Sequence, residues 1–564
     1  MSTPRQLVLL CDGTNNNLSG RHSDTHVVLL AELMRLFPDP DRLIYYDPGV
    51  GNPGQLPGTT IVDKVRRAMD RIDGLAFGRG LYDNVAEGYR FLMANWRPGD
   101  QIFLFGFSRG AFTARSIGGL VNAFGIIDGH QETLVSSLVS TYFSKASAER
   151  DDITAQASRL FGQGGTPADW PQVHFVGVWD TVASVGLPPF GLKITARPTL
   201  AGKHFRHVRQ ALALDEQRAQ FLPRAYAQDD GAFPMANERV GDIRQCWFRG
   251  SHCDVGGGNV YPYSELSRAP FAWLVSEAIQ CGLRLPAPAG QAPLVNEADV
   301  FHVMPQLDPP TLQRMAARIN SETHVTPLWA LTGLKVRDTA HALIDGEPPV
   351  PVTMHAHPTV ALWTHAFPAA TAWSERRGSG AWAKLLLALL LMAALALLAG
   401  WALLVHQGLV PSLERTREIL AADLAFQRWQ LSLASMGDWA AQAGGFARPG
   451  HALLLDTALI AAYAWVLSFW VCRAFARHAR LIRVGTTPSR WLNRAGWVLP
   501  VAVGADLVEN AASWLSLTAV DGVAIDWWAW PARGVLLAAS AVKWAALAGV
   551  VVLIATSFLR RGRR

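Results

Sequence analysis

The chain has 564 residues, half of them hydrophobic, and 51 Lys and Arg against 45 Asp and Glu give it a net charge of +6. This length exceeds what one hydrophobic core usually organises, and much of the positive charge lies in arginines beside long apolar stretches, which favours membrane topology over a nucleic-acid groove. The five cysteines form no C-x-x-C pair and indicate neither a zinc site nor a disulfide framework, so no metal or cofactor is expected.

The first 378 residues have the pattern of a mixed soluble domain. Short apolar segments alternate with helical patterns there, which predicts an α/β fold with a mostly parallel sheet and helices on both faces. In such sheets functional side chains gather at the carboxyl ends of the strands. The first segment is too short for a secretory signal, so no cleaved leader is expected. The predicted strands are residues 6–11, 43–47, 101–105, 174–179 and 245–248.

A G-x-S-x-G sequence, Gly106 to Gly110, follows the third predicted strand and precedes a helix-compatible stretch. This order predicts a nucleophile elbow, in which the chain reverses sharply and presents Ser108 above the sheet edge. A side chain at Gly106 or Gly110 would collide with the neighbouring strand or helix. The amide of Arg109, at the helix N-terminus, would receive a developing oxyanion. A plain strand-turn-helix is the alternative.

A serine nucleophile needs a base, and the base needs a carboxylate to hold its tautomer. Ser108, Asp180 and His252 occur in the order that hydrolases use, each at the end of a predicted strand. Asp254 is the alternative acid because it lies two residues from His252, and the sequence does not decide between it and Asp180. The structural alternatives are a turn or capping carboxylate for Asp180 and a hydrogen-bonded loop histidine for His252.

Other residues are weaker candidates for the same chemistry. The amides of Gly13 or Thr14, after the first strand, are candidates for the second oxyanion donor, and Asp12 would order that turn. His355 and His357 are alternative bases, but they lack a strand-end position and lie close to the first apolar stretch.

The last part of the chain, residues 379–564, predicts a helical transmembrane domain. Residues 382–405 carry one charge and would extend about 36 Å as a helix, enough for a bilayer core of about 30 Å. The third stretch contains Asp506 and Glu509 on one helical face, so it either spans the membrane with that face inside a bundle or lies along the interface. The four predicted spans are residues 382–405, 452–472, 495–517 and 535–559.

Charged residues give the tail an expected orientation and interior. Arginines follow the second and fourth spans and lie on one side with the N-terminal domain, which predicts that this side is cytoplasmic. An arginine-containing loop after the first span weakens the contrast. Asp456, Asp506, Glu509 and Lys543 lie in apolar surroundings, where pairing inside a helix bundle is favoured over a transport pathway.

Five ordered motifs carry a family resemblance: LLCDGTNNN, FLFGFSRGAFTAR, VGVWDTVASVG, ALALDEQRAQFLPRAY and WFRGSHCDVGGG. Over residues 5–278 the chain resembles the catalytic domain of type VI secretion lipase effectors of the phospholipase type. The resemblance implies an α/β-hydrolase fold, a Ser-Asp-His triad and hydrolysis of glycerophospholipid acyl esters. It supports Ser108 and His252 directly, and Asp180 through the WDT motif. The four-span tail is less typical of that family.

These observations predict a membrane-anchored serine hydrolase, most simply a phospholipase of A type. Its expected partners are membrane phospholipid and the bilayer, with no nucleic acid. The tail leaves open whether the chain is a resident enzyme of the bacterial inner membrane or a toxin delivered to a target-cell membrane, with an immunity or secretion-apparatus partner. A membrane-tethered esterase or thioesterase on another substrate and a catalytically silent docking module are the alternatives. Head-group preference, positional preference and oligomeric state are not predicted.

Overall fold

A computed structural model of the chain divides into two compact units by its internal contacts. One unit comprises Met1–Glu322, Arg337–Pro368 and Ile482–Pro488, and the other comprises Thr323–Val336, Ala369–Leu481 and Ser489–Arg564. The structure describes residues 3–13, 24–49, 74–143, 152–153, 156–157, 159–163, 171–182, 184–185, 192–193, 205–226, 242–259, 265–288, 290–303, 327–342, 350–352, 354–363, 447–479, 485–518 and 529–559.

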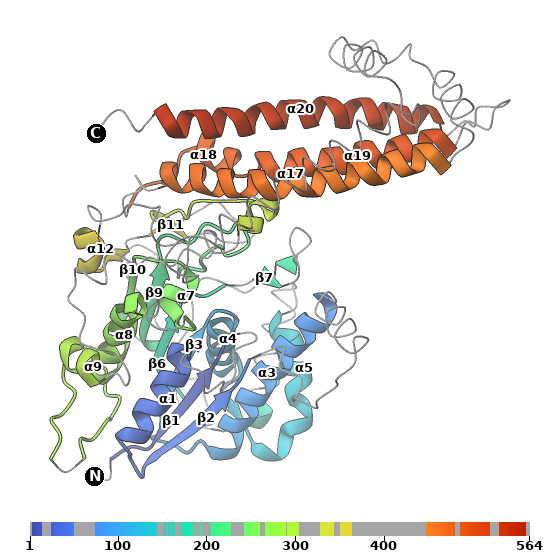
Figure 1. Ribbon diagram of the computed structural model, residues 1–564. Helices are drawn as coiled ribbons and strands as arrows, with labels where there is room; N and C mark the ends of the chain where they lie inside the picture. Colours follow the sequence, from blue (N-terminus) through green and yellow to red (C-terminus); the bar gives the residue numbers. More distant parts are fainter. Residues whose placement is uncertain are drawn as a thin grey trace, which may run out of the picture. The chain divides into compact units, whose positions relative to one another are not determined.

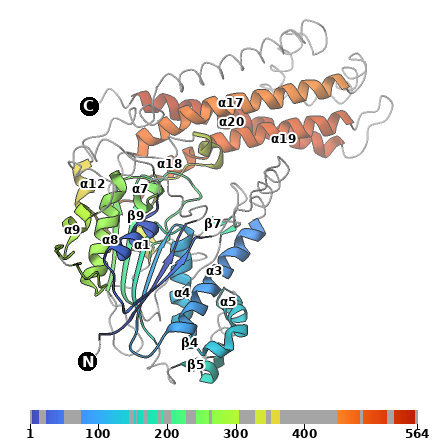
Figure 2. The same cartoon turned by 60° about the horizontal axis from the view of Figure 1, so that its bottom comes forward.

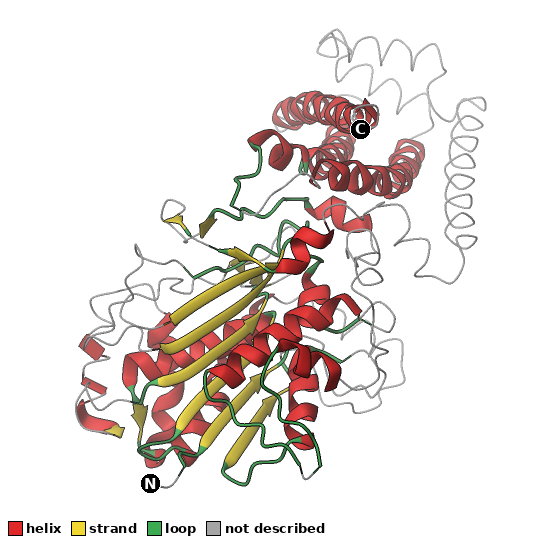
Figure 3. Ribbon diagram, turned by 90° about the vertical axis from the view of Figure 1, so that its left-hand side faces the viewer, coloured by secondary structure: helices red, strands yellow, loops and turns green. Residues whose placement is uncertain are grey.

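The first unit is built on a sheet of seven parallel strands (Figures 1 and 3). Its order is β13-β10-β9-β6-β3-β1-β2, so the strand that precedes Ser108, β3, lies between β1 and β6. Because all pairs are parallel, the carboxyl ends of the strands share one edge. The strands are β1 Gln6–Cys11, β2 Arg42–Asp47, β3 Gln101–Phe107, β6 Val173–Trp179, β9 Phe205–Ala213, β10 Asp242–Phe248 and β13 His355–Ala356.

Strands β1, β3 and β6 are mostly apolar because both faces of the sheet are covered. Every residue of β1 is buried, and successive side chains alternate between two hydrophobic cores. Val8 and Phe103 belong to one core, and Leu9 and Leu104 belong to the other. These strands therefore read as continuous apolar runs rather than as alternating patterns.

Helices close both cores, as Figure 2 shows. Helices α1 (His26–Leu36) and α8 (Arg268–Gln280) cover one face. Helices α3 (Gly74–Asn95), α4 (Arg109–Phe124) and α5 (Val135–Phe143) cover the other. The smaller elements of this unit are β4 Ile126–Ile127, η1 Gly129–Leu134, β5 Gly162–Gln163, β7 Ser184–Val185, β8 Leu192–Lys193, α7 His252–Gly256, η2 Glu265–Ser267, α9 Glu297–Val303, β11 His341–Ala342, β12 Val350–Pro351 and α12 Pro358–Trp363. The short helix η3 Pro327–Thr332 belongs to the second unit.

The predicted α/β class with a mostly parallel sheet is confirmed, and each of the five predicted strands is present. Strand β9 was not predicted, because its sequence FRHVRQALA carries Arg and Gln inside the sheet. Arg209 there is buried because Glu277 and Asp242 pair with it, which keeps a polar side chain in a core position. Such a strand has no apolar signature in the sequence.

The second unit is helical, with α17 Ala447–Ala479, α18 Arg490–Ala495, α19 Val498–Thr518 and α20 Ala529–Leu559. Among the described helices, α20 contains a stretch, Gly534–Phe558, that is long and apolar enough to cross a membrane. This is weak evidence for membrane association by itself, since it rests on length and composition. The predicted span 452–472 falls within α17, and the predicted span 495–517 overlaps α19 but begins three residues before it. The predicted span 382–405 lies outside the described residues.

Charged residues of this unit pair between its helices. Lys543 of α20 forms ion pairs with Asp506, at 3.2 Å, and with Glu509, both on α19. The Tyr463 hydroxyl of α17 donates to the Asp506 carboxylate at 2.6 Å. The pairing expected inside a helix bundle is therefore present for these residues, and it joins three helices that pack against one another.

Candidate active site

Ser108 lies at the tight turn between β3 and α4 in a strained backbone conformation, with φ 59° and ψ −122°. Among the residues that the structure describes, Ser108 and Asp180, with φ 43°, are the non-glycine residues with positive φ. Such conformations cost free energy and persist only where the surrounding packing enforces them, often at functional sites. Both strained residues follow central strands of the sheet, β3 and β6, at its carboxyl edge.

The glycines on either side of Ser108 leave no room for a side chain. A Cβ atom at Gly106 would lie 2.4 Å from the Gly110 carbonyl oxygen and 2.7 Å from the Ala111 Cα. A Cβ atom at Gly110 would lie 2.2 Å from the Cys11 carbonyl oxygen and 2.3 Å from that of Asp12. The turn can therefore close onto helix α4 and the end of β1 only if both positions are glycine.

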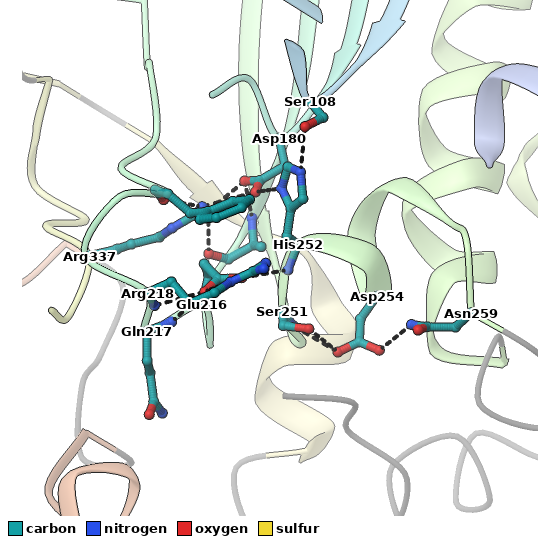
Figure 4. Close-up of polar contacts among 12 residues, drawn as sticks. Ser108, Asp180, Glu216, Gln217, Arg218, Ser251, His252, Asp254, Asn259 and Arg337 are labelled. Carbon is teal, nitrogen blue, oxygen red and sulfur yellow. Dashed lines mark hydrogen bonds and ion pairs between the residues drawn. The ribbon is translucent and has the colours of Figure 1, made fainter. Parts of the chain in front are cut away.

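His252, the first residue of α7, faces the Ser108 hydroxyl (Figure 4). Its Nε2 lies 2.8 Å from Ser108 Oγ, and its Nδ1 lies 2.6 Å from Asp180 Oδ2. The imidazole is nearly completely buried and contacts the rings of Phe107 and Phe221, with centroids 4.6 Å and 5.1 Å away. These aromatic contacts restrict the ring to an orientation that joins hydroxyl and carboxylate.

Asp180 is fully buried and its carboxylate is bound on both oxygens. Oδ1 accepts the Ala213 N–H at 2.9 Å, and Arg337 donates Nη1 to Oδ1 and Nη2 to Oδ2, the latter at 2.9 Å. Burial by itself would raise the pKa of Asp180, but the Arg337 charge and the contact with His252 outweigh it and hold the pKa well below its ordinary value.

The ionised state of Asp180 fixes the proton positions of the neighbouring imidazole. An ionised carboxylate only accepts hydrogen bonds, so His252 Nδ1 must carry the proton that faces Asp180. In the neutral imidazole, Nε2 then has its lone pair toward Ser108, and the serine hydroxyl donates to it. The arrangement can take a proton from Ser108 and hold the resulting imidazolium beside a carboxylate.

Glu216, after β9, fixes the start of α7. Its Oε2 accepts the His252 backbone N–H at 3.2 Å, and both of its oxygens accept hydrogen bonds from the Arg218 guanidinium at 2.8 Å and 2.9 Å. Burial would raise the pKa of Glu216, but the neighbouring Arg218 and Arg337 charges lower it. The buried carboxylate therefore stays charged and holds the backbone of the residue that carries the imidazole.

Asp254, the alternative acid, is engaged away from the His252 ring (Figure 4). Its Oδ2 accepts the Ser251 N–H at 2.8 Å and the Ser251 hydroxyl at 2.9 Å, and its Oδ1 accepts the Asn259 amide at 3.1 Å. Ser251 and Asp254 form a capping box at the N-terminus of α7. In this geometry Asp180, and not Asp254, contacts the imidazole.

The candidate oxyanion donors have different surroundings. The Arg109 amide begins α4 directly after Ser108, at the positive end of the helix. The Gly13 N–H donates to Asp12 Oδ1 at 2.7 Å, so an internal hydrogen bond occupies it in this structure. Thr14 lies outside the described residues.

The other histidine candidates lie elsewhere. His357 contacts Thr359 through Nδ1 and Glu297 through Nε2, and its ring stacks on Phe248. His355 lies on the edge strand β13 and is exposed. Within the described ranges of the chain, no group of three or more His, Cys, Asp or Glu side chains is arranged to hold a metal ion.

Two residues of this network were missed by the sequence analysis. Glu216 lies within the motif ALALDEQRAQFLPRAY, which contributes to the family resemblance but does not by itself give Glu216 a role. Arg337 reaches Asp180 across 157 positions of the chain and belongs to no motif, so no local pattern could have identified it.

The fold and the site define an α/β protein with a serine-histidine-aspartate relay at the carboxyl edge of a parallel sheet. Residues 5–277 match the family model described as T6SS, Phospholipase effector Tle1-like, catalytic domain. This match agrees with the resemblance drawn from the sequence motifs, and the phospholipase effector family that it names supports a hydrolase.

Two further proteins are similar to the chain. An uncharacterized protein of Saccharomyces cerevisiae is 29% identical over 229 residues, which are 39% of this chain and 32% of the yeast protein. The chain thus spans about a third of the length of that relative. A crystal structure of an uncharacterized protein from Pseudomonas aeruginosa matches with 15% identity and a TM-score of 0.28, covering 95% of this chain and 76% of the other.

Proposed function

We propose that the chain is a serine hydrolase that cleaves acyl esters of glycerophospholipids, as a phospholipase of A type on an α/β-hydrolase fold. Ser108 is the nucleophile, His252 the general base and then the general acid, and Asp180 the carboxylate that orients the imidazole. The single observation that carries the proposal is the relay from Ser108 Oγ to His252 Nε2, at 2.8 Å, and from His252 Nδ1 to Asp180, at 2.6 Å. The phospholipase family of residues 5–277 supports the substrate class.

The reaction proceeds in two half-reactions. Ser108 Oγ attacks the acyl carbonyl while His252 Nε2 takes the hydroxyl proton, and the Arg109 amide stabilises the oxyanion. The ester bond breaks, the lysophospholipid leaves as an alcohol with the proton from His252, and an acyl-serine remains. Water then attacks the acyl group, loses a proton to His252 and releases the fatty acid. Ser108 recovers its proton, so no cofactor is consumed.

The apolar C-terminal region would hold the catalytic unit at its substrate. The stretch Gly534–Phe558 supports membrane association, and an enzyme held at the headgroup layer meets a high effective concentration of lipid. Membership of an effector family further supports delivery into the membrane of a target cell, with an immunity protein as a partner.

The experiment compares Ser108→Ala with a matched control, Ser116→Ala, which removes a hydroxyl from a buried serine of α4, the helix that follows Ser108. Fatty acid and lysophospholipid are measured by mass spectrometry after incubation with vesicles of phosphatidylethanolamine and phosphatidylglycerol. The wild type and Ser116→Ala should release both products, and Ser108→Ala should be slower by a factor of about 10³ or more.

Two results would contradict the proposal. If Ser108→Ala releases fatty acid at the wild-type rate, Ser108 is not the nucleophile. If the wild type cleaves soluble esters or thioesters but no phospholipid, the chain is an esterase of another substrate class.

A further inference from the structure

Arg337 makes a closely fitted set of contacts with the triad acid. Its guanidinium is buried, with 2% of the residue exposed, and two of its nitrogens meet the two oxygens of Asp180. The same nitrogens donate to the backbone carbonyls of Ala213, at 2.8 Å, and Phe221, at 2.6 Å. Four acceptors thus fix the guanidinium plane, and the fork of Arg337 fixes the plane of the carboxylate.

The charges around the imidazole balance only if Arg337 is counted. Among the described residues, the charged groups connected with His252 are Asp180 after β6, Glu216 with its partner Arg218 after β9, and Arg337. Two carboxylates and two guanidiniums leave this buried cluster neutral before His252 takes a proton. Without Arg337 the cluster would carry a net negative charge, which favours the protonated imidazole and thus the inactive form.

The position of Arg337 in the chain is unexpected for a residue at this site. The family model of the catalytic domain ends at residue 277, and Arg337 follows Thr323–Val336, a segment that belongs to the helical unit. The contact with Asp180 therefore comes from a part of the chain that the catalytic-domain family does not include.

We propose that Arg337 is a positioning residue of the active site, supplied from beyond the matched catalytic domain, which keeps Asp180 ionised and directs its Oδ2 at His252. The inference rests on the proposed role of Ser108 as the nucleophile. This role goes beyond stabilising the fold, because the Arg337 guanidinium sets both the orientation of the Asp180 carboxylate and the electrostatic potential at His252.

The test measures the reactivity of Ser108 directly, with a fluorophosphonate probe and the full-length chain. The rate constant of labelling is recorded between about pH 5 and pH 9 for the wild type, Arg337→Met, Arg337→Lys and Arg209→Met. Arg209→Met is the matched control because Arg209 is another buried arginine of the same unit, paired with Asp242 and Glu277 away from Ser108. Thermal unfolding of each variant shows whether it is folded.

Arg337→Met should label more slowly by about 10²-fold, and the acidic limb of its pH profile should move to higher pH because the imidazolium loses a repelling charge. Arg337→Lys keeps the charge but not the fork, so it should be slower by about tenfold with an acidic limb close to that of the wild type. Arg209→Met should label at the wild-type rate per folded molecule even if it unfolds at a lower temperature.

Three results would overturn the inference. One is an Arg337→Met variant that is labelled at the wild-type rate with its acidic limb unmoved. If Arg337→Met does not fold, an unchanged labelling rate in Arg337→Lys has the same meaning. Another is an equal loss in Arg209→Met, which would show a general effect of breaking a buried ion pair. A wild-type protein that is not labelled at Ser108 would instead refute the proposed nucleophile itself, and with it the inference.

Discussion

The two ends of the same parallel sheet each hold an ionic network around a buried arginine, with similar residue types but different geometry. At the carboxyl end, His252 lies between Asp180 and the Ser108 hydroxyl. Toward the amino end, Arg209 of β9 pairs with Asp242 and Glu277, and His207 lies 3.7 Å from Asp242. Both networks contain histidine, carboxylates and arginine, so residue types alone do not distinguish a reactive site from a structural one.

The difference lies in what the histidine faces and in backbone strain. The positive φ values of Ser108 and Asp180 occur at the carboxyl end, where the backbone turns sharply after β3 and β6. At the amino end, burial and the neighbouring His174 and Arg209 side chains lower the pKa of His207 to about 4. That imidazole stays neutral at neutral pH and faces no hydroxyl among its described contacts. The contact of an imidazole with the Ser108 hydroxyl, rather than buried charge, therefore distinguishes the candidate site.

The largest expected effect separates the two histidines. His252→Ala should lower phospholipid hydrolysis by about 10⁴-fold or more, because it removes the group that takes the serine proton. His207→Ala should leave turnover per folded molecule unchanged. Steady-state rates on phospholipid vesicles check both variants, and an equal loss in the two would break the distinction between the ends of the sheet.

The next effect separates the two carboxylates. Asp180→Asn should lower turnover by about 10³-fold, because an amide cannot hold the Nδ1 proton in place and permits the wrong imidazole tautomer. Asp242→Asn weakens a pair with Arg209 and should affect stability but not turnover. The same assay applies, and near wild-type turnover in Asp180→Asn would point to another acid.

The elbow is expected to be intolerant of a methyl group. Gly110→Ala would place a Cβ 2.2 Å from the Cys11 carbonyl oxygen, and we expect a local loss of about 3 kcal/mol. In Gly129→Ala the added Cβ has its nearest neighbour at 3.5 Å, which is ordinary contact, so stability should be nearly unchanged. Hydrogen exchange of peptides covering β3 and α4 measures the difference. Equal protection in Gly110→Ala and the wild type would refute the steric account.

The smallest expected effect concerns Asp12, beside the elbow. Burial raises the pKa of Asp12 from 3.8 to about 6, although Gly13, Thr25 and Tyr46 donate hydrogen bonds to it. The folded state therefore binds more protons than the unfolded state between these values, and this stabilisation is lost as the pH rises through about 6. Asp12→Asn lacks this loss, so its stability relative to the wild type should rise by about 2 kcal/mol between pH 4 and pH 7.

The stability contribution of Asp242 is expected to depend on pH in the opposite direction to that of Asp12. Burial would raise its pKa, but the contact with Arg209 lowers it overall, so its stabilisation is lost as the pH falls. Thermal unfolding of Asp12→Asn and Asp242→Asn over a pH series measures both trends. A parallel dependence on pH in the two variants would contradict the opposite pKa directions at the two ends of the sheet.

The parts of the site that could be predicted from the sequence are those with a local pattern. The elbow is encoded by two glycines at fixed spacing, and Asp180 and His252 were predicted because they follow predicted strands in the order that hydrolases use. The spacing of Ser251 and Asp254 is that of a capping box, which could have assigned Asp254 to the helix start. Strands β1, β3 and β6 could be predicted because a sheet covered on both faces leaves nearly continuous hydrophobic runs.

The rest depends on contacts between distant segments. Strand β9 was not predicted because its buried Arg209 forms ion pairs with residues that lie far away in the sequence. Glu216 contacts the His252 backbone and Arg337 contacts the Asp180 carboxylate, and these partners become neighbours only after folding. Of the four predicted spans, the first lies outside the described residues, and the helix α20 gives weak support to the last.

The most direct test of the central claim is to map the adduct of a fluorophosphonate on the wild-type chain by peptide mass spectrometry. The relay predicts a single major adduct on the peptide that contains Ser108, and predicts that this adduct is lost in His252→Ala. An adduct on another residue, or equal labelling of Ser108 in His252→Ala, would contradict it.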